Sequence, residues 1–391
     1  MARITANQIE SIPIGPLGII AMPGCESLAS KVNDYLVQWR KIQATEHSNT
    51  IAFYGYQRGD YRIDFSVPRF GTGEGKCSIF DSVRGYDIYI IADVFNYHCT
   101  YKMYGMTVPM SPDDHFCDIK RVISAISGKA KRITVVTPML YCGRQHKRSS
   151  RESLDCAVAL QELVELGVEC IITFDAHDQR VQNAIPNKSF ENVMPYYQFV
   201  KAIVNTYDDL KLDKEHLMVI SPDEGAMHRN IFYATQLGVD LGMFYKRRDY
   251  TQIVGGKNKI VAHEYLGSSV EGKDIIIYDD MISSGESILD VAKKLKALKA
   301  NRVFLCTTFG LFCNGLDVFD KAYEDGLFEK VFTTNGVYQS PELLSREWYQ
   351  SVELSKYMAY MLDTLNHDIS MSPLLDSREK IDKLLTKKGL K

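Results

Sequence analysis

The sequence lacks the features that mark several specialised classes of protein. It contains no run of about 18 apolar residues, the length that a membrane-spanning helix needs. The nine cysteines are an odd number and include no CxxC pair, so neither a disulfide framework nor a zinc site of common spacing is indicated. The net charge of −3 gives no excess of the basic residues that nucleic-acid-binding proteins usually carry.

The N-terminus lacks the charged-then-apolar pattern of a signal peptide. We therefore expect a cytoplasmic protein with reduced thiols that binds neither nucleic acid nor a membrane. What remains is an ordinary globular composition, with 45% hydrophobic and 24% charged residues. At about 150 residues per domain, 391 residues correspond to two or three domains, and we expect two.

Short apolar runs rich in β-branched residues recur along the chain, and helical periodicity follows each of them. Runs that are apolar on both faces are typical of central parallel strands covered by helices on both sides. The predicted strands are residues 86–91, 132–140, 170–174, 217–220, 274–278 and 303–308, and the predicted crossover helices include 153–166, 227–237 and 286–297. The pattern predicts an α/β fold with two doubly wound parallel-sheet halves.

The two halves are expected to be separate domains. We expect the first over residues 1–192, with an insertion near 100–115, and the second over 193–391. The second would end in a C-terminal tail that is helical over 341–365 and then charged.

The most informative segment is IIIYDDMISSGES at residues 275–287. An apolar strand ends in two adjacent carboxylates, Asp279 and Asp280, and a turn and a helix follow. Backbone N–H groups in such a turn, at a helix N-terminus, bind anions. The small residues of the segment are Ser283, Ser284, Gly285 and Ser287. Because two carboxylates would repel a phosphate, we expect them to face sugar hydroxyls or a metal ion; the alternative is a capped helix that follows two surface acids.

This segment resembles the 5-phosphoribosyl diphosphate loop of type I phosphoribosyltransferases. Further segments follow the order found in ribose-phosphate pyrophosphokinases (phosphoribosyl diphosphate synthetases), and the resemblance spans residues 16–340. These segments are RFGTGE at 69–74, GRQHKR at 143–148, FDAHDQ at 174–179, and the pair SPDEG at 221–225 and YKRR at 245–248. The resemblance implies an enzyme that transfers the β,γ-diphosphoryl group of ATP to the 1-hydroxyl of ribose 5-phosphate, with Mg²⁺ as cofactor.

The resemblance also implies roles for the residues that match the family's motifs. His177 and Asp223 would help to hold magnesium. His177 would also contact ATP and take part in catalysis, since an imidazole at the end of a strand can bind a metal or a phosphate. Lys246 and Arg248 would be catalytic, because fixed cations stabilise the charge of a transferred phosphoryl group.

Two sets of binding residues complete the expected site. The ribose 5-phosphate set is Asp279, Asp280, Ser283, Ser284, Gly285 and Ser287, and the ATP set is Phe70, Thr72, Glu74, Arg144, Gln145 and His177. In the family, the wall that contains Phe70, Thr72 and Glu74 comes from a neighbouring subunit. The resemblance therefore implies a dimer as the minimum unit, and commonly a hexamer. Residues 250–272, which are polar and interrupted by glycines, predict a flap that closes over the reaction.

Three positions depart from the family pattern. His146 replaces the usual aspartate after Arg-Gln, Thr72 replaces an acid, and Ser283 follows the transferase version of the phosphoribosyl loop. Two other functions therefore stay open: a phosphoribosyltransferase that consumes the same diphosphate, and a catalytically silent paralogue that regulates active synthetases. The transferase alternative does not explain Arg144-Gln145 or the Asp175-Ala176-His177 segment in the first half.

Overall fold

The computed structural model describes residues 12–46, 55–254 and 257–391, with side chains described for 12–42, 55–245 and 264–391. The chain divides into two compact units. The first contains residues up to 194 together with 336–338 and 353–376, and the second contains 195–335, 339–352 and 377–391. The sequence-based division at 192/193 gave the whole C-terminal tail to the second domain, whereas in the structure residues 353–376 group with the first unit.

The first unit is built on a five-stranded sheet with the strand order β1-β4-β7-β8-β9, in which all neighbouring strands are parallel. These strands are β1 (Leu17–Ala21), β4 (Asp87–Ile91), β7 (Arg132–Val136), β8 (Cys170–Phe174) and β9 (Ser189–Val193). Strand β7 ends before Pro138 and is shorter than predicted, because proline has no N–H to donate to the ladder.

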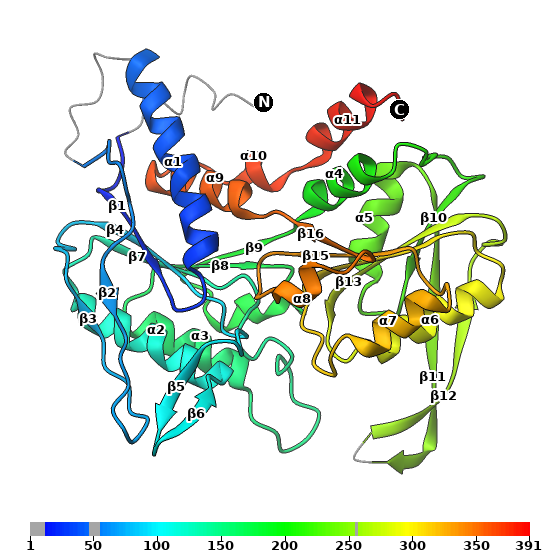
Figure 1. Ribbon diagram of the computed structural model, residues 1–391, viewed down its shortest axis with the longest axis horizontal. Helices are drawn as coiled ribbons and strands as arrows, with labels where there is room; N and C mark the ends of the chain where they lie inside the picture. The colour runs from blue at the N-terminus through cyan, green and yellow to red at the C-terminus, as the bar shows by residue number, and fades with distance from the viewer. Residues whose placement is uncertain (1–11, 47–54, 255–256) are drawn as a thin grey trace. The chain divides into compact units, whose positions relative to one another are not determined.

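Helices cover both faces of this sheet (Figure 1). They are α1 (Glu26–Glu46), α2 (Pro112–Ile126), α3 (Asp155–Glu165), the 3₁₀ helix η2 (Gln179–Ala184), α9 (Ser355–Asn366) and α10 (Ser372–Leu375). Helix α2 begins where Ser111 and Asp114 form a reciprocal capping box and Pro112 occupies the first turn. Its buried face joins residues of α3 and the sheet in one apolar core.

Two short hairpins project from the first unit. One pairs β2 (Phe65–Ser66) with β3 (Ser78–Ile79), and the other pairs β5 (Thr100–Met103) with β6 (Met106–Pro109). The second hairpin occupies the insertion expected near 100–115. It turns at Tyr104 and Gly105, which both have positive φ angles, as tight two-residue hairpin turns require.

A buried polar network fixes the C-terminal helix α9 to the first unit. The Arg40 guanidinium, 1% exposed, donates to Asp363 Oδ1 at 2.9 Å and to Asn366 Oδ1 at 2.8 Å. Asn366 Nδ2 in turn donates to Asp87 Oδ2 at 2.9 Å, at the start of β4. Because buried polar groups must be paired, this network accounts for the grouping of residues 353–376 with the first sheet.

The second unit is built on a seven-stranded sheet in the order β12-β11-β10-β13-β14-β15-β16. The β11–β12 pair is antiparallel, and the other neighbours are parallel. The strands are β10 (Leu217–Ser221), β11 (Asp240–Val254), β12 (Lys257–Leu266), β13 (Asp274–Ile282), β14 (Val303–Gly310), β15 (Lys330–Thr334) and β16 (Tyr349–Val352).

Helices also lie on both faces of the second sheet (Figure 1). They are α4 (Tyr196–Thr206), α5 (Met227–Leu237), α6 (Glu286–Ala297), α7 (Asp317–Glu324), α8 (Pro341–Leu344) and α11 (Arg378–Lys387). Side chains of α6 and α7 share an apolar core with β13 and β14. The fold class predicted from the sequence, two parallel-sheet halves with a helical C-terminal tail, is therefore confirmed.

Two predicted segments differ in detail. The prediction of a continuous helix over 341–365 is wrong, because the edge strand β16 separates α8 from α9. The expected flap at 250–272 begins in the β11–β12 hairpin, whose register runs from Met243 opposite Leu266 to Val254 opposite Lys257. Its closure over a site stays a prediction. Among the helices of the described ranges, none has both the length and the apolarity needed to cross a membrane.

Candidate functional site

The acidic pair Asp279 and Asp280 lies within strand β13, near its carboxyl end, rather than after it. Pairing of β13 with β10 stops at Ile277, whereas pairing with β14 continues to Ile282. The two acids therefore lie beyond the end of one neighbouring strand, where an open α/β sheet usually binds its ligands. Asp280 is 5% exposed, and the Asp279 side chain is 24% exposed.

The two carboxylates lie close enough to affect each other's ionisation, and the protein shields them in part from water. Burial raises the pKa of Asp279 well above its usual value, and the charge of Asp280 raises it further. The Arg229 guanidinium, which lies 3.6 Å from Asp279 Oδ1, opposes this shift, and Asp223 adds to it. A bound cation or hydroxyl donors at this position would therefore offset part of the cost of the charged carboxylates.

Asn230, which the sequence analysis did not single out, fixes the strand at this point. It is fully buried on α5, donates from Nδ2 to the Tyr278 carbonyl at 2.8 Å and accepts from Tyr278 N at 3.3 Å. The pairing of β10 with β13 ends at Ile277, so the Asn230 side chain bonds the backbone N–H and carbonyl of Tyr278 in place of β10. Tyr278 directly precedes the two acids. No sequence motif indicates this role, because an asparagine inside an amphipathic helix resembles any other polar residue.

A tight turn follows the strand and opens helix α6. The Ser283 carbonyl accepts from Cys313 N at 2.9 Å, and the Ser283 hydroxyl lies 3.7 Å from Cys313 Sγ. Gly285 is the N-cap of α6 with φ +91°, and as a glycine it has no side chain to cap the helix. Glu286 N donates to Ser284 Oγ at 3.5 Å, so Ser284 makes one long contact with the first turn, and the alternative of a helix capped by Ser283 or Ser284 stays a prediction. The other N–H groups of the first turn and the serine hydroxyls form the kind of cradle that binds a phosphate.

The Asp175-Ala176-His177 segment follows β8 in the first unit, as predicted. The chain turns sharply at Asp175, whose φ is 41°, and His177 is exposed. The ring centroids of His177 and His146 are 5.3 Å apart. His146, which departs from the family pattern, has its Nε2 3.5 Å from Oδ2 of Asp178, the residue that directly follows His177.

The electrostatics of this histidine cluster favour neutral imidazole at His146. Burial lowers the pKa of His146, Asp178 opposes the shift, and His177 adds to it. Within the described part of the chain, His146 Nδ1 is buried and makes no hydrogen bond. A ligand could form a hydrogen bond with His146 Nδ1 only if the loop moved, because this atom is closed off from solvent.

Arg144 and Gln145 lie in the loop after β7, in the same unit as His177. Arg144 is exposed. Gln145 donates from Nε2 to the Ser153 carbonyl at 2.9 Å, which ties this loop to the segment before α3. The exposed Arg144 guanidinium therefore lies on a loop that the hydrogen bond of Gln145 holds in place.

The residues predicted to form the nucleotide wall lie on a separate turn of the first unit. Phe70 N donates to the Glu74 carbonyl at 2.8 Å, and the Thr72 hydroxyl donates to Glu74 Oε2 at 2.8 Å. Phe70 is 57% exposed, as are several other large apolar side chains of the described residues to a similar degree. The structure therefore places these three residues together, on an exposed hairpin turn.

Lys246 and Arg248 lie on β11, opposite His263 and Ile260 of β12. Their side chains fall outside the described residues, as do those of the rest of residues 246–263. Their predicted catalytic role is a proposal that rests on the sequence.

The donor atoms fit magnesium only together with a phosphate ligand. Among the residues whose side chains are described, no three histidine, cysteine, aspartate or glutamate side chains gather closely enough to hold a metal ion. Asp223 is close enough to raise the pKa of Asp279, so two carboxylates approach each other in the second unit. Mg²⁺ commonly takes one or two carboxylates and completes its shell with water and substrate phosphates, which this pair allows. His177 belongs to the other unit, and imidazole suits magnesium less well.

Comparisons with known proteins agree with this arrangement. Residues 17–167 match the family model described as the N-terminal domain of ribose phosphate pyrophosphokinase, and residues 187–346 match the phosphoribosyl transferase domain. The ribose-phosphate pyrophosphokinase of Vibrio parahaemolyticus is 27% identical over 318 residues, which are 80% of this chain and 91% of the relative. That of Shewanella oneidensis is 28% identical over 318 residues, with 80% and 90% covered.

A solved structure supports the fold at lower sequence identity. The crystal structure of phosphoribosylpyrophosphate synthetase from Mycobacterium smegmatis superposes with a TM-score of 0.69 at 20% identity. The match covers 90% of this chain and 99% of that one. At this identity the likeness establishes the arrangement of helices and strands and nothing about activity.

The turn at Gly285 can be tested by two alanine substitutions. A Cβ at Gly285 would lie 2.5 Å from Cζ of the buried Phe319 ring, in addition to the strain of the positive φ. Gly272 also has a positive φ, +75°, but a Cβ there meets nothing within 4 Å. We expect G285A to lower the free energy of unfolding by about 3 kcal/mol and G272A by about 1 kcal/mol, as measured by denaturant titration. Equal losses would mean that the aromatic ring does not restrict the turn.

Proposed function

The chain belongs to the ribose-phosphate pyrophosphokinase family, and we propose that it transfers the β,γ-diphosphoryl group of ATP to the 1-hydroxyl of ribose 5-phosphate. The products are 5-phosphoribosyl 1-diphosphate and AMP. The observation that carries the proposal is the pair of carboxylates near the end of β13, followed by a serine-rich turn and a helix whose N-cap is a glycine, in the second of two domains that match the family in order.

Ribose 5-phosphate is proposed to bind along the end of β13. The 5-phosphate would accept hydrogen bonds from the first-turn N–H groups of α6 and from Ser283, Ser284 and Ser287, with Gly285 keeping side-chain atoms out of the turn. The sugar hydroxyls would donate to the carboxylates Asp279 and Asp280, which relieves their mutual repulsion. Binding of this kind fixes the position of the 1-hydroxyl, which is the main contribution a protein makes to phosphoryl-type transfer.

ATP is proposed to bind through the first unit. Arg144 and Gln145 would contact the adenine or the phosphates, and His177 would contact the phosphates from the neighbouring loop. On the sequence match, Lys246 and Arg248 stabilise the charge that develops on the transferred group. Magnesium, held by Asp223 and His177 together with the substrate phosphates, would neutralise the charge of the triphosphate when bound.

Self-association is part of the proposal. Phe70, Thr72 and Glu74 would complete the nucleotide pocket of a second copy of the chain, with a dimer as the minimum unit and a hexamer as the expected assembly. Phe70 is 57% exposed, so its ring is available for a contact with another subunit. We also propose a cytoplasmic location, which the nine free cysteines support.

The function is tested by incubating the purified protein with ATP, Mg²⁺ and ribose 5-phosphate. We expect AMP and 5-phosphoribosyl 1-diphosphate to appear in equal amounts without ADP, because the two terminal phosphates move as one group. EDTA should abolish the reaction, and added Mg²⁺ should restore it. Formation of a nucleotide from 5-phosphoribosyl 1-diphosphate and a free base would support the transferase instead. Absence of AMP would favour the silent paralogue.

Asn230 is proposed to be a positioning residue, since it touches the strand and not the substrate. N230A should raise the KM for ribose 5-phosphate about tenfold and leave the KM for ATP unchanged, because only the acids next to Tyr278 lose their support. N301A is the matched control: Asn301 donates to Asp274 Oδ1 at 2.8 Å, at the opposite end of the same strand. If N301A raises the KM for the sugar as much as N230A does, the effect is a general loss of stability and the assigned role is wrong.

A further inference from the structure

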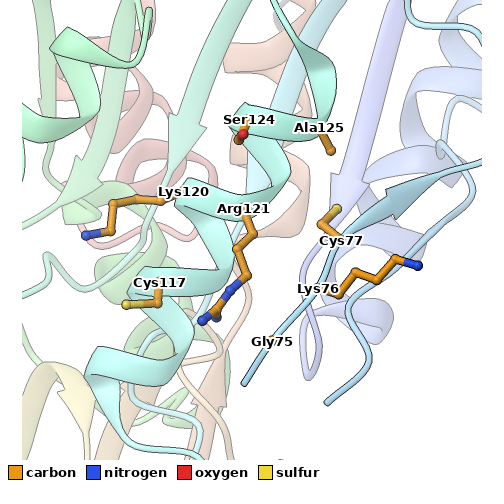
Figure 2. A pocket seen from close by; sticks show the side chains of 8 residues that line it. All are labelled: Gly75, Lys76, Cys77, Cys117, Lys120, Arg121, Ser124 and Ala125. Atoms are coloured by element: carbon orange, nitrogen blue, oxygen red, sulfur yellow. The ribbon is translucent and has the colours of Figure 1, made fainter. Parts of the chain in front are cut away.

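A groove with no assigned role crosses the first unit between helix α2 and the chain segment that leads into β3. Its volume is about 490 Å³. Figure 2 shows the side chains that line it, with Arg121 reaching from the helix toward the strand and Lys120 and Lys76 extending to opposite sides. The lining residues are Gly75, Lys76, Cys77, Cys117, Lys120, Arg121, Ser124 and Ala125. None of them is among the residues proposed to bind ATP, ribose 5-phosphate or metal.

The groove is positively charged, because three of its eight lining residues are basic and none is acidic. One carboxylate lies behind it: Asp118, 1% exposed, accepts from Arg121 Nη1 at 2.7 Å. The same Asp118 accepts a bidentate pair from Arg69 at 2.6 and 2.8 Å. A single carboxylate therefore pairs directly with two guanidinium groups, and Asp114 acts on Arg69 without a hydrogen bond in this set.

The outer charges leave the groove with a positive excess. Lys120 pairs with Glu162 at 2.8 Å, so those two charges cancel at one side. Lys76 is exposed and adds a further positive charge on the other side. Asp114 also acts on Arg69, so Arg69, Arg121, Lys76 and Lys120 are set against Asp114, Asp118 and Glu162, a local net charge of +1.

Gly75 explains how the two guanidinium groups reach this position. A Cβ at this residue would collide with Arg69 Nη1 and would lie 2.6 Å from Arg121 Nη1. With a glycine here, the strand passes close to both groups, and a larger residue would require the guanidinium groups to shift. In the described part of the chain, Arg69 Nε is buried and makes no hydrogen bond, so the ion pair with Asp118 leaves part of this donor set unused. The local sequence thus brings guanidinium donors together and supplies too few acceptors for them.

We propose that this groove binds a small molecule that carries phosphate groups. Guanidinium and ammonium donors favour the doubly charged, multidentate oxygens of a phosphate, and Ser124 adds a hydroxyl donor. The volume lies within the range of about 300–1,000 Å³ that is typical of small-molecule sites, so it exceeds what a single inorganic phosphate fills. The proposal goes beyond the proposed function, because it concerns a separate site in the first unit.

Two native cysteines allow ligand binding at the groove and at the proposed sugar site to be measured separately in one experiment, through the alkylation rate of each. Cys117 lines the groove, and Cys313 lies next to Ser283 in the second unit. The full-length protein is treated with iodoacetamide at constant ionic strength, with increasing pyrophosphate and no Mg²⁺, and the alkylation rate of each cysteine is followed by peptide mass spectrometry. We expect pyrophosphate to slow alkylation of Cys117 saturably, on the order of tenfold, because a bound anion blocks access and disfavours the thiolate.

The variant S124E tests whether the groove itself is responsible. Ser124 is exposed, so the change is compatible with folding, and the new carboxylate would pair with Lys120 four residues earlier and repel the anion. The protection of Cys117 should then require about tenfold more pyrophosphate. The control K129Q removes one exposed positive charge near the end of α2, outside the groove, and should leave the protection unchanged.

Several results would overturn the proposal. They are a Cys117 rate that does not respond to pyrophosphate, protection that is not saturable, and equal protection in the wild type and S124E. If Cys117 reacts too slowly to be timed, calorimetric titration with pyrophosphate replaces it, and S124E must then lose a binding event that K129Q keeps. Protection of Cys313 by ribose 5-phosphate is measured in the same digest, so failure of the sugar site and failure of the groove are distinguished.

Discussion

Two adjacent carboxylates at the end of a buried strand are the constraint on which the second unit depends. Asp279 and Asp280 repel each other, and burial makes their charged forms costly. Other interactions of the fold must therefore offset the free energy that this arrangement costs. Arg229 supplies a partial counter-charge, and Asn230 fixes the backbone one residue earlier. Such strain persists in a stable protein only where the surrounding structure over-determines it, and it commonly marks a site that gains free energy from its ligand.

The turn that follows the acids combines with them in a simple electrostatic pattern. The N-terminus of α6 favours negative charge, whereas the carboxylates favour hydroxyls or a cation. A molecule that has a phosphate at one end and hydroxyls at the other matches both preferences at once. The end of β13 and the start of α6 together therefore favour a phosphorylated sugar as ligand, and this preference depends on both ends of the site more than on any single residue.

Much of the architecture could be predicted from the sequence, because buried parallel strands leave strong apolar runs. The runs at 217–220 and 303–308 correspond to β10 and β14, and the helix predicted at 286–297 is α6. The extension of β13 through the acids could not be read in this way, because its apolar pattern stops at Tyr278 and only pairing with β14 continues it. Strand β16 was missed because four residues between two helical patterns carry little signal, and Asn230 was missed because its role appears only when α5 packs against β13.

Ribose 5-phosphate affinity in Asp280→Asn is the most direct test of the central claim. Asparagine keeps the shape of the side chain and removes one of the two repelling charges. Calorimetry should therefore show binding of ribose 5-phosphate weakened about tenfold or more, while the thermal unfolding temperature stays equal or rises. An unchanged affinity in a stably folded D280N protein would contradict the account, because the sugar would then bind without the acidic pair.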